Sequence, residues 1–202
     1  MPKSQRHLTD VFLNIPYDKP FEKLCLAYIC GLSGLGLVPR ATLEIPGGAR
    51  RLDRIFALIR DCRYSVHDLS RVELDLKRPA TPRFNMPFEL GLAVAWERLS
   101  PGNHSWFLCE RRAYRLFKSL SDLNGTDAYI HGGSVTGVFR ELGNAFVRLR
   151  QQPTIQEMFR IYREVKAGVP TILKGAGTDS IYNARVFKDL CVLANASAER
   201  IV

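Results

Sequence analysis

The chain has 202 residues and is 46% hydrophobic, which is enough for one domain of about 150 residues with an extension and excludes bulk disorder. Its longest apolar runs fall far short of the roughly 18 residues of a membrane span, and the polar residues 1–10 lack the apolar centre of a signal peptide. The formal net charge of +9 favours anionic ligands such as nucleotides, or weak association with nucleic acid. A solvated basic surface is the simpler explanation, because no aromatic-rich basic stripe or zinc-finger spacing is present.

The five cysteines are scattered along the chain and form no Cys-x-x-Cys pair. An odd, scattered set favours reduced, mostly buried thiols and a cytoplasmic protein. The four histidines are equally dispersed, and no His-Glu-x-x-His or Walker sequence occurs, so we expect neither a metal nor a cofactor. The cysteines are Cys25, Cys30, Cys62, Cys109 and Cys191.

Strand-like and helix-like apolar patterns alternate along residues 9–150. Pro16 ends the first expected strand, and Pro39 favours an edge position for the second. In chain order we expect a strand over 9–15, a helix over 18–35, a strand over 37–43, a helix over 50–62, a strand over 64–69, a polar loop over 71–84, a helix over 85–99 capped by Asn85, a strand over 105–109, a helix over 111–120, a strand over 128–131 and a helix over 135–150.

Strands that alternate with helices in this way predict an α/β fold: a flavodoxin-like parallel sheet of about five strands with helices on both faces. We assign this α/β domain to residues 1–150. Residues 151–202 are expected to form a helical C-terminal extension, with helices over 154–167 and 181–194 separated by the glycines at 175–177. The extension either packs on the domain or mediates self-association.

Parallel sheets of this kind bind ligands at the carboxyl ends of their strands. After the first strand, Asn14 and Asp18 offer polar contacts and Tyr17 an aromatic ring for a base, although Asp18 equally suits the N-cap of the next helix. After the second strand, Arg40 and Glu44 suit a phosphate and a base edge, with solvated loop charges as the simpler alternative.

Two carboxylates stand out near the third strand and the helix over 85–99. Asp68 ends the strand, and Glu89 lies about one turn inside the helix among apolar residues. Paired acids in a partly dry cleft suit chemistry at the anomeric carbon of a sugar, so we expect both in one small pocket. The alternatives are a turn cap for Asp68 and a stabilising helix-start charge for Glu89. Ser70 and Asn85 suit a ribose hydroxyl or a phosphate as well as they suit caps.

The segments 12–18, 68–70 and 85–93 resemble the nucleoside 2-deoxyribosyltransferase-like superfamily, which is structurally close to TIR-like domains. The resemblance covers residues 9–150 and is strongest over 50–95. It implies that Glu89 attacks the anomeric carbon and forms a glycosyl-enzyme, and that Asp68 orients or protonates the base. It also implies that Tyr17 packs on the nucleoside and that neighbouring subunits complete the pocket, so a homo-oligomer is expected.

The chain departs from the transferases of this superfamily just before Glu89, where they usually carry another acid and this chain has Arg83 and Asn85. A cation there suits a phosphorylated substrate, and several relatives hydrolyse nucleotides or NAD in bacterial defence. We therefore expect cleavage or transfer at the N-glycosidic bond of a nucleotide, nucleoside or NAD, through Glu89 and possibly in defence. The alternative is a TIR-like module that senses a nucleotide or binds a protein without chemistry.

Overall fold

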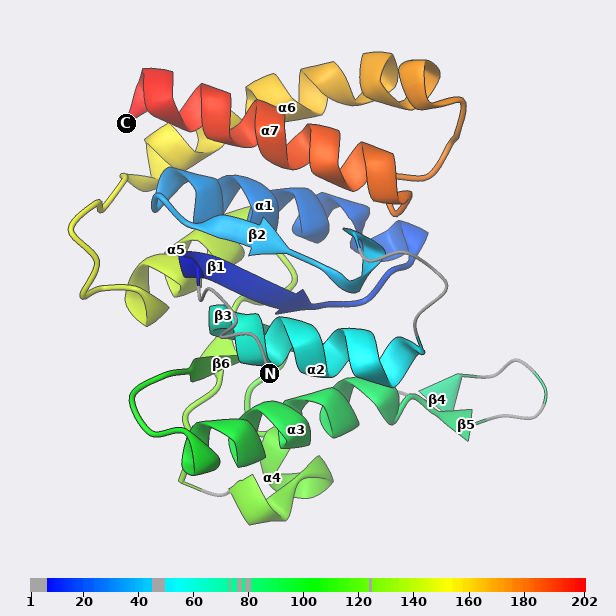
Figure 1. Cartoon of the computed structure of the whole chain (residues 1–202), viewed down its shortest axis with the longest axis vertical. Helices are drawn as coiled ribbons and strands as arrows, with labels where there is room; N and C mark the ends of the chain where they lie inside the picture. Colours follow the sequence, from blue (N-terminus) through cyan, green and yellow to red (C-terminus); the bar gives the residue numbers. More distant parts are fainter. Residues whose placement is uncertain (1–6, 45–49, 73, 76–77, 79–80, 124) are drawn as a thin grey trace, which may run out of the picture.

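The computed structural model describes residues 7–44, 50–72, 74–75, 78, 81–123 and 125–202. Its centre is a five-stranded sheet in which all neighbouring strands are parallel, in the order β2-β1-β3-β6-β7 (Figure 1). The chain starts at β1, adds β2 on one side and continues from β3 on the other, which is the flavodoxin-like order. The predicted fold class is confirmed. The strands are β1 (His7–Asn14), β2 (Val38–Arg40), β3 (Cys62–Asp68), β6 (Ser105–Glu110) and β7 (Tyr129–Ile130).

Helices cover both faces of the sheet, and the C-terminal pair forms an additional layer (Figure 1). One face carries α2 (Arg51–Asp61) and α3 (Asn85–Leu99). The other face carries α1 (Glu22–Gly34) and α5 (Val135–Ala145). The last two helices, α6 (Ile155–Ala176) and α7 (Ala184–Ile201), pack against each other and on α1.

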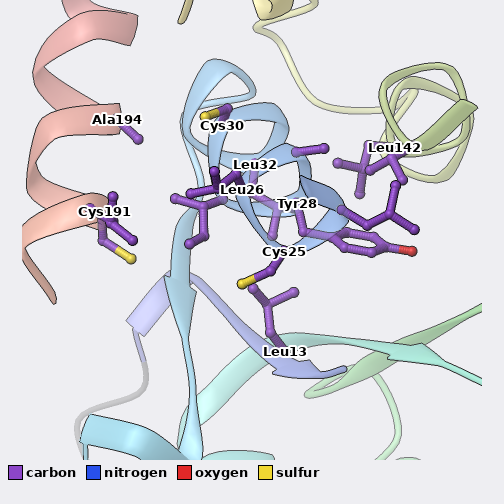
Figure 2. Packing of buried hydrophobic residues seen from close by; sticks show 14 of the residues in the cluster. Leu13, Cys25, Leu26, Tyr28, Cys30, Leu32, Leu142, Cys191 and Ala194 are labelled. Atoms are coloured by element: carbon purple, nitrogen blue, oxygen red, sulfur yellow. The ribbon is translucent and has the colours of Figure 1, made fainter. Parts of the chain in front are cut away.

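The period of two along the strands divides the core between the two faces. Val11 and Leu13 of β1 belong to the cluster on the α1 side, whereas Phe12 packs with α2 and α3 residues on the other side. Figure 2 shows α1 surrounded by the first cluster, with Cys191 of α7 on one flank and Leu142 of α5 on the other. All five cysteines are buried free thiols, as the sequence predicts.

Residues 111–120 do not form the expected single helix. The structure has α4 only over Leu116–Ser119, followed by a short 3-10 turn, η3 (Ser121–Leu123). A carboxylate oxygen of Glu110 accepts the backbone N–H groups of Arg111 and Arg112, and Tyr114 has a φ of 63°. This local bonding and the left-handed residue prevent a regular helix before Leu116.

Several other boundaries differ from the expectation. The segment 18–35 begins with a 3-10 turn, η1 (Lys19–Phe21), before α1, and the strand over 37–43 shortens to β2 with η2 (Thr42–Glu44) after it. The loop over 71–84 contains a small antiparallel pair, β4 (Leu74–Asp75) with β5 (Thr81–Pro82).

The C-terminal helices differ most, because α6 is far longer than 154–167. Thr154 and Glu157 form a capping box at its start, and it runs through Pro170 to end before Gly177, whose φ is 64°. Apolar residues beyond Pro170, such as Ile172 and Leu173, pack on the core and outweigh the lost hydrogen bond. The helix α7 is displaced by a few residues from 181–194, and α5 ends at Ala145 rather than at 150. Within the described ranges, no helix is both long and apolar enough to cross a bilayer.

Candidate functional site

A pocket of about 360 Å³ opens at the carboxyl ends of β1, β2 and β3. The sheet order reverses between β1 and β3, and in open α/β sheets this switch point is where ligands bind. The volume falls within the range of small-molecule sites, roughly 300–1,000 Å³. The lining residues come from the segments after these strands and from the starts of α2 and α3: Asn14, Ile15, Pro16, Tyr17, Thr42, Arg51, Arg71, Arg83, Asn85, Met86 and Glu89.

Glu89 supplies the carboxylate of this pocket. It lies in the second turn of α3, and only 3% of its surface is exposed. Burial raises the pKa of Glu89, while Arg51, whose guanidinium donates to Glu89 Oε1 at 3.4 Å, opposes that rise. A buried carboxylate with one distant, half-exposed cationic partner retains an oxygen that can react with a ligand.

Three arginines give the pocket a cationic wall. Arg71 and Arg83 both donate to Asp18 Oδ2, at 3.2 and 3.1 Å, and Arg51 lies on the α2 side. Asp18 occupies the N-cap position of η1, as the alternative predicted, but its side chain binds the two arginines and makes no cap hydrogen bond. Guanidinium groups arranged in this way suit a phosphate.

Asn14 connects β1 to the start of α3. Its amide Nδ2 donates to the backbone oxygen of Met86 at 3.1 Å and to His67 Nδ1 at 2.9 Å. Both amide hydrogens are therefore used within the protein. Asn14 lines the pocket, as expected, and it also fixes the helix that carries Glu89.

The bond to His67 continues as a chain through the interior. His67 Nε2 donates to Ser65 Oγ, Ser65 donates to His104 Nε2, and His104 Nδ1 donates to the carbonyl oxygen of Cys62, each over 2.9 to 3.1 Å. The amide nitrogen of Asn14 can only donate and the carbonyl oxygen of Cys62 can only accept, so the two ends fix the direction of every hydrogen bond between them. His67 is therefore neutral, with its proton on Nε2.

Tyr17 lines the pocket beside Thr42, with the two hydroxyl oxygens 3.5 Å apart. Its ring lies against that of Tyr182, with the ring centroids 5.3 Å apart. Tyr182 also donates to the backbone oxygen of Asp18 at 2.9 Å. The segment that leads into α7 thus supports the wall that Tyr17 forms.

Asn85 lines the pocket but does not cap α3, contrary to the expectation. The N-cap residue is Phe84, whose φ of −86° and ψ of −14° are helical, and no side-chain cap bond is present there. Asn85 is the first residue of the helix, and its exposed side chain is directed to solvent at the pocket.

Asp68 is placed elsewhere. It is fully buried, and it accepts from the Tyr28 hydroxyl at 2.8 Å and from the Ser70 N–H at 2.8 Å, with His131 Nε2 at 3.1 Å. Its partner Tyr28 belongs to α1, on the opposite side of the sheet from α3, and Asp68 is not among the described residues that line the pocket of Glu89. The expectation that the two acids face one small pocket is therefore wrong.

Three further predicted residues are also absent from the described lining of this pocket: Asp18, Ser70 and Arg40. Ser70 contacts His131 through its Oγ, 3.0 Å from Nε2, and lines a smaller neighbouring cavity. Arg40 is held by Asp10 and by Glu44, whose Oε2 lies 3.1 Å from Nε. Two carboxylates neutralise Arg40, so it is a structural part of the β2 edge.

Six lining residues were not predicted from the sequence: Ile15, Pro16, Thr42, Arg51, Arg71 and Met86. Arg51 and Arg71 were detectable, because the first starts a predicted helix and the second directly follows a predicted strand end. In the described part of the chain, no group of three or more His, Cys, Asp or Glu side chains could hold a metal ion.

The chain was compared with models of protein families, with curated proteins and with solved structures, and none of them matches. The function of the site is therefore inferred from its own geometry and chemistry.

Proposed function

We propose that the protein cleaves the N-glycosidic bond of a phosphorylated nucleotide, with Glu89 as the nucleophile. The observation that carries the proposal is a buried carboxylate that faces a pocket walled by three arginines at the switch point of the sheet. The arginines suit the phosphate, and Glu89 suits the sugar carbon, where positive charge develops as the bond breaks. The resemblance of residues 85–93 to the deoxyribosyltransferase-like superfamily points to the same residue.

The reaction balances in two steps. First, a carboxylate oxygen of Glu89 bonds to the anomeric carbon while the bond from that carbon to the base breaks, and the bonding electron pair leaves with the base. Second, water attacks the same carbon, the ester bond to Glu89 breaks, and the proton of the water passes to solvent. The products are a free base and a sugar phosphate. Arg51 favours the ionised form of Glu89 that the first step needs.

The lining residues also determine which kind of base can leave, because a neutral base needs a proton donor. Glu89 is the one carboxylate among the described residues that line the pocket, because Asp18 binds Arg71 and Arg83 without lining it. Asp68, the expected proton donor, is buried on the other side of the sheet. A neutral base needs a proton to leave, whereas a base that is cationic in the substrate, such as the nicotinamide of NAD, leaves as a neutral molecule. We therefore expect a nucleotide with a cationic base to be the better substrate.

The test is the release of free base, measured by chromatography, from NAD, from nucleoside 5′-monophosphates and from free nucleosides. We expect release from phosphorylated substrates, fastest from NAD, and a loss on the order of a thousandfold or more in Glu89→Gln. Glu97→Gln, on the same helix but outside the pocket, is the matched control and should retain the wild-type rate. If no substrate yields base, or if Glu89→Gln matches the wild type, the proposal fails.

A second function is favoured by the isolation of Asp68, which leaves the pocket with a single described carboxylate. In that case the protein senses a nucleotide without chemistry, as a TIR-like binding module. Calorimetry distinguishes the two: a sensor binds nucleotide, retains that affinity in Glu89→Gln, and releases no base.

A further inference from the structure

A second, smaller cavity of about 100 Å³ adjoins the main pocket. Arg71 lines both cavities, so the two are neighbours that share this side chain. The smaller cavity is formed by the start of α1 and by the segments that follow β3, β6 and β7. Its lining residues are Pro20, Phe21, Lys23, Leu24, Ser70, Arg71, Arg111 and Gly133.

The charges that line this cavity are only partly compensated. Lys23, Arg71 and Arg111 line it, and no described lining residue is acidic. Arg71 is shared with Asp18, but within the described part of the chain neither Lys23 nor Arg111 has an ion-pair partner. The nearby carboxylate of Glu110 is fully engaged, because Arg115 donates to both of its oxygens at 2.7 and 2.8 Å. Two unpaired cations around a small cavity favour an anion.

Ser70 adds a hydrogen-bond donor at this cavity. His131 Nδ1 accepts from the backbone N–H of Gly133 at 3.0 Å, so the proton of the neutral ring is on Nε2. Nε2 therefore donates toward Asp68 and Ser70 Oγ and cannot serve as a base for the serine. The hydroxyl hydrogen of Ser70 is not used by His131 and can be donated to a ligand.

Gly133 brings Arg111 into position. Its φ is 72°, and a Cβ at this residue would lie 2.8 Å from Arg111 Nε. The guanidinium thus packs directly on the glycine backbone. Arg111 follows β6 directly, and its backbone N–H is bound by Glu110 Oε1, so its location is fixed from both sides.

We propose that this cavity holds a second phosphoryl group of the ligand whose first phosphoryl group lies in the main pocket. Arg71 contacts both groups, Lys23 and Arg111 neutralise the second, and the Ser70 hydroxyl donates to it. The substrate class is then a nucleotide that contains a pyrophosphate. This inference rests on the proposed function for the placement of the nucleotide, and it is tested by binding alone.

The experiment measures the affinities of AMP, ADP and inorganic pyrophosphate by equilibrium dialysis. The full chain carries Glu89→Gln in every sample, so that ligand is not consumed. We expect ADP to bind at least tenfold more tightly than AMP. The double substitution Lys23→Met with Arg111→Met should remove that advantage and weaken pyrophosphate binding, while it leaves AMP within twofold of its original affinity.

The charge-matched control is Lys19→Met with Arg112→Met, two exposed cations that do not line the cavity. This control should leave all three affinities unchanged. The inference is overturned if ADP binds no more tightly than AMP, if both double variants weaken ADP equally, or if neither ADP nor pyrophosphate binds. Because base release is not measured, an inactive protein that keeps the ADP preference refutes only the proposed function.

Discussion

At the scale of single residues, the neutral His67 makes the free energy of unfolding depend on pH. Burial, with a smaller effect of His104, lowers the pKa of His67 to about 3, against an ordinary value of about 6.5 in the unfolded chain. Between these two values the unfolded chain binds a proton that the folded chain does not. The free energy of unfolding therefore falls as pH drops from 6.5 toward 3.

This predicts that the wild type loses stability between pH 7.5 and pH 5.0, with a contribution from His67 of about 2 kcal/mol. Urea unfolding at the two pH values measures it. In His67→Asn, whose amide oxygen can still accept from Asn14, the loss over the same interval should be smaller by about that amount. An unchanged pH dependence in the variant contradicts a neutral, buried His67.

Nine site residues were predicted from the sequence, and five of them line the main pocket. Asp68 does not, and the strand geometry explains why. Successive residues of a strand face opposite sides of the sheet, so His67 and Asp68 diverge. His67 faces the α3 side with Asn14, and Asp68 faces Tyr28 of α1. Its position at a strand end placed Asp68 at the same edge of the sheet as the pocket, but only the assignment of α1 and α3 to opposite faces decides which acid lines that pocket.

At the scale of elements, the start of α5 is fitted tightly to the end of β7. A Cβ on Gly137 would lie 1.9 Å from the backbone oxygen of His131, which cannot move independently of the strand. Gly143, later in the same helix, has no such neighbour within 4 Å. The structure therefore has no room for a side chain at Gly137 but has room for one at Gly143.

We predict that Gly137→Ala lowers the free energy of unfolding by about 1–3 kcal/mol through overpacking. Gly143→Ala should instead raise it by roughly 0.5–1 kcal/mol, because alanine favours the helix. Thermal or urea unfolding of the two variants tests both signs. Equal effects would show that α5 does not approach His131 as closely as the structure has it.

The order and type of most elements followed from apolar period, Pro and Gly, whereas their ends depended on tertiary contacts. The helix α6 passes Pro170 because Ile172 and Leu173 still reach the core. The segment 111–120 has a helical composition, yet the Glu110 side chain takes the backbone N–H groups at its start. Neither contact can be read from a local window of sequence.

At the scale of the whole molecule, the C-terminal helices share one hydrophobic cluster with the sheet and α1. Phe187 of α7 is 1% exposed and belongs to the same cluster as Leu13 of β1. Both tryptophans, Trp96 and Trp106, lie in clusters on the α2 and α3 side. Their fluorescence therefore reports the unfolding of the α/β part from a position remote from α7.

We predict that Phe187→Ala lowers the unfolding midpoint seen by tryptophan fluorescence, with a loss of about 3–5 kcal/mol. Val192→Ala, on the exposed side of the same helix, should change stability by less than about 0.5 kcal/mol. A fluorescence midpoint that is insensitive to Phe187→Ala would mean that residues 151–202 unfold as a separate unit.

The proposed function depends on the joint arrangement of Glu89 and the arginine wall, and the proposed covalent step is its most direct test. The protein is incubated with a nucleotide that carries fluorine at C2′, which slows hydrolysis of a glycosyl ester, and the intact chain is then weighed by mass spectrometry. We predict a gain equal to one fluorinated sugar phosphate less one water, the mass of the glycosyl group, in the wild type and none in Glu89→Gln. Release of base with no gain in mass, or the same gain in both proteins, would contradict the role of Glu89 as nucleophile.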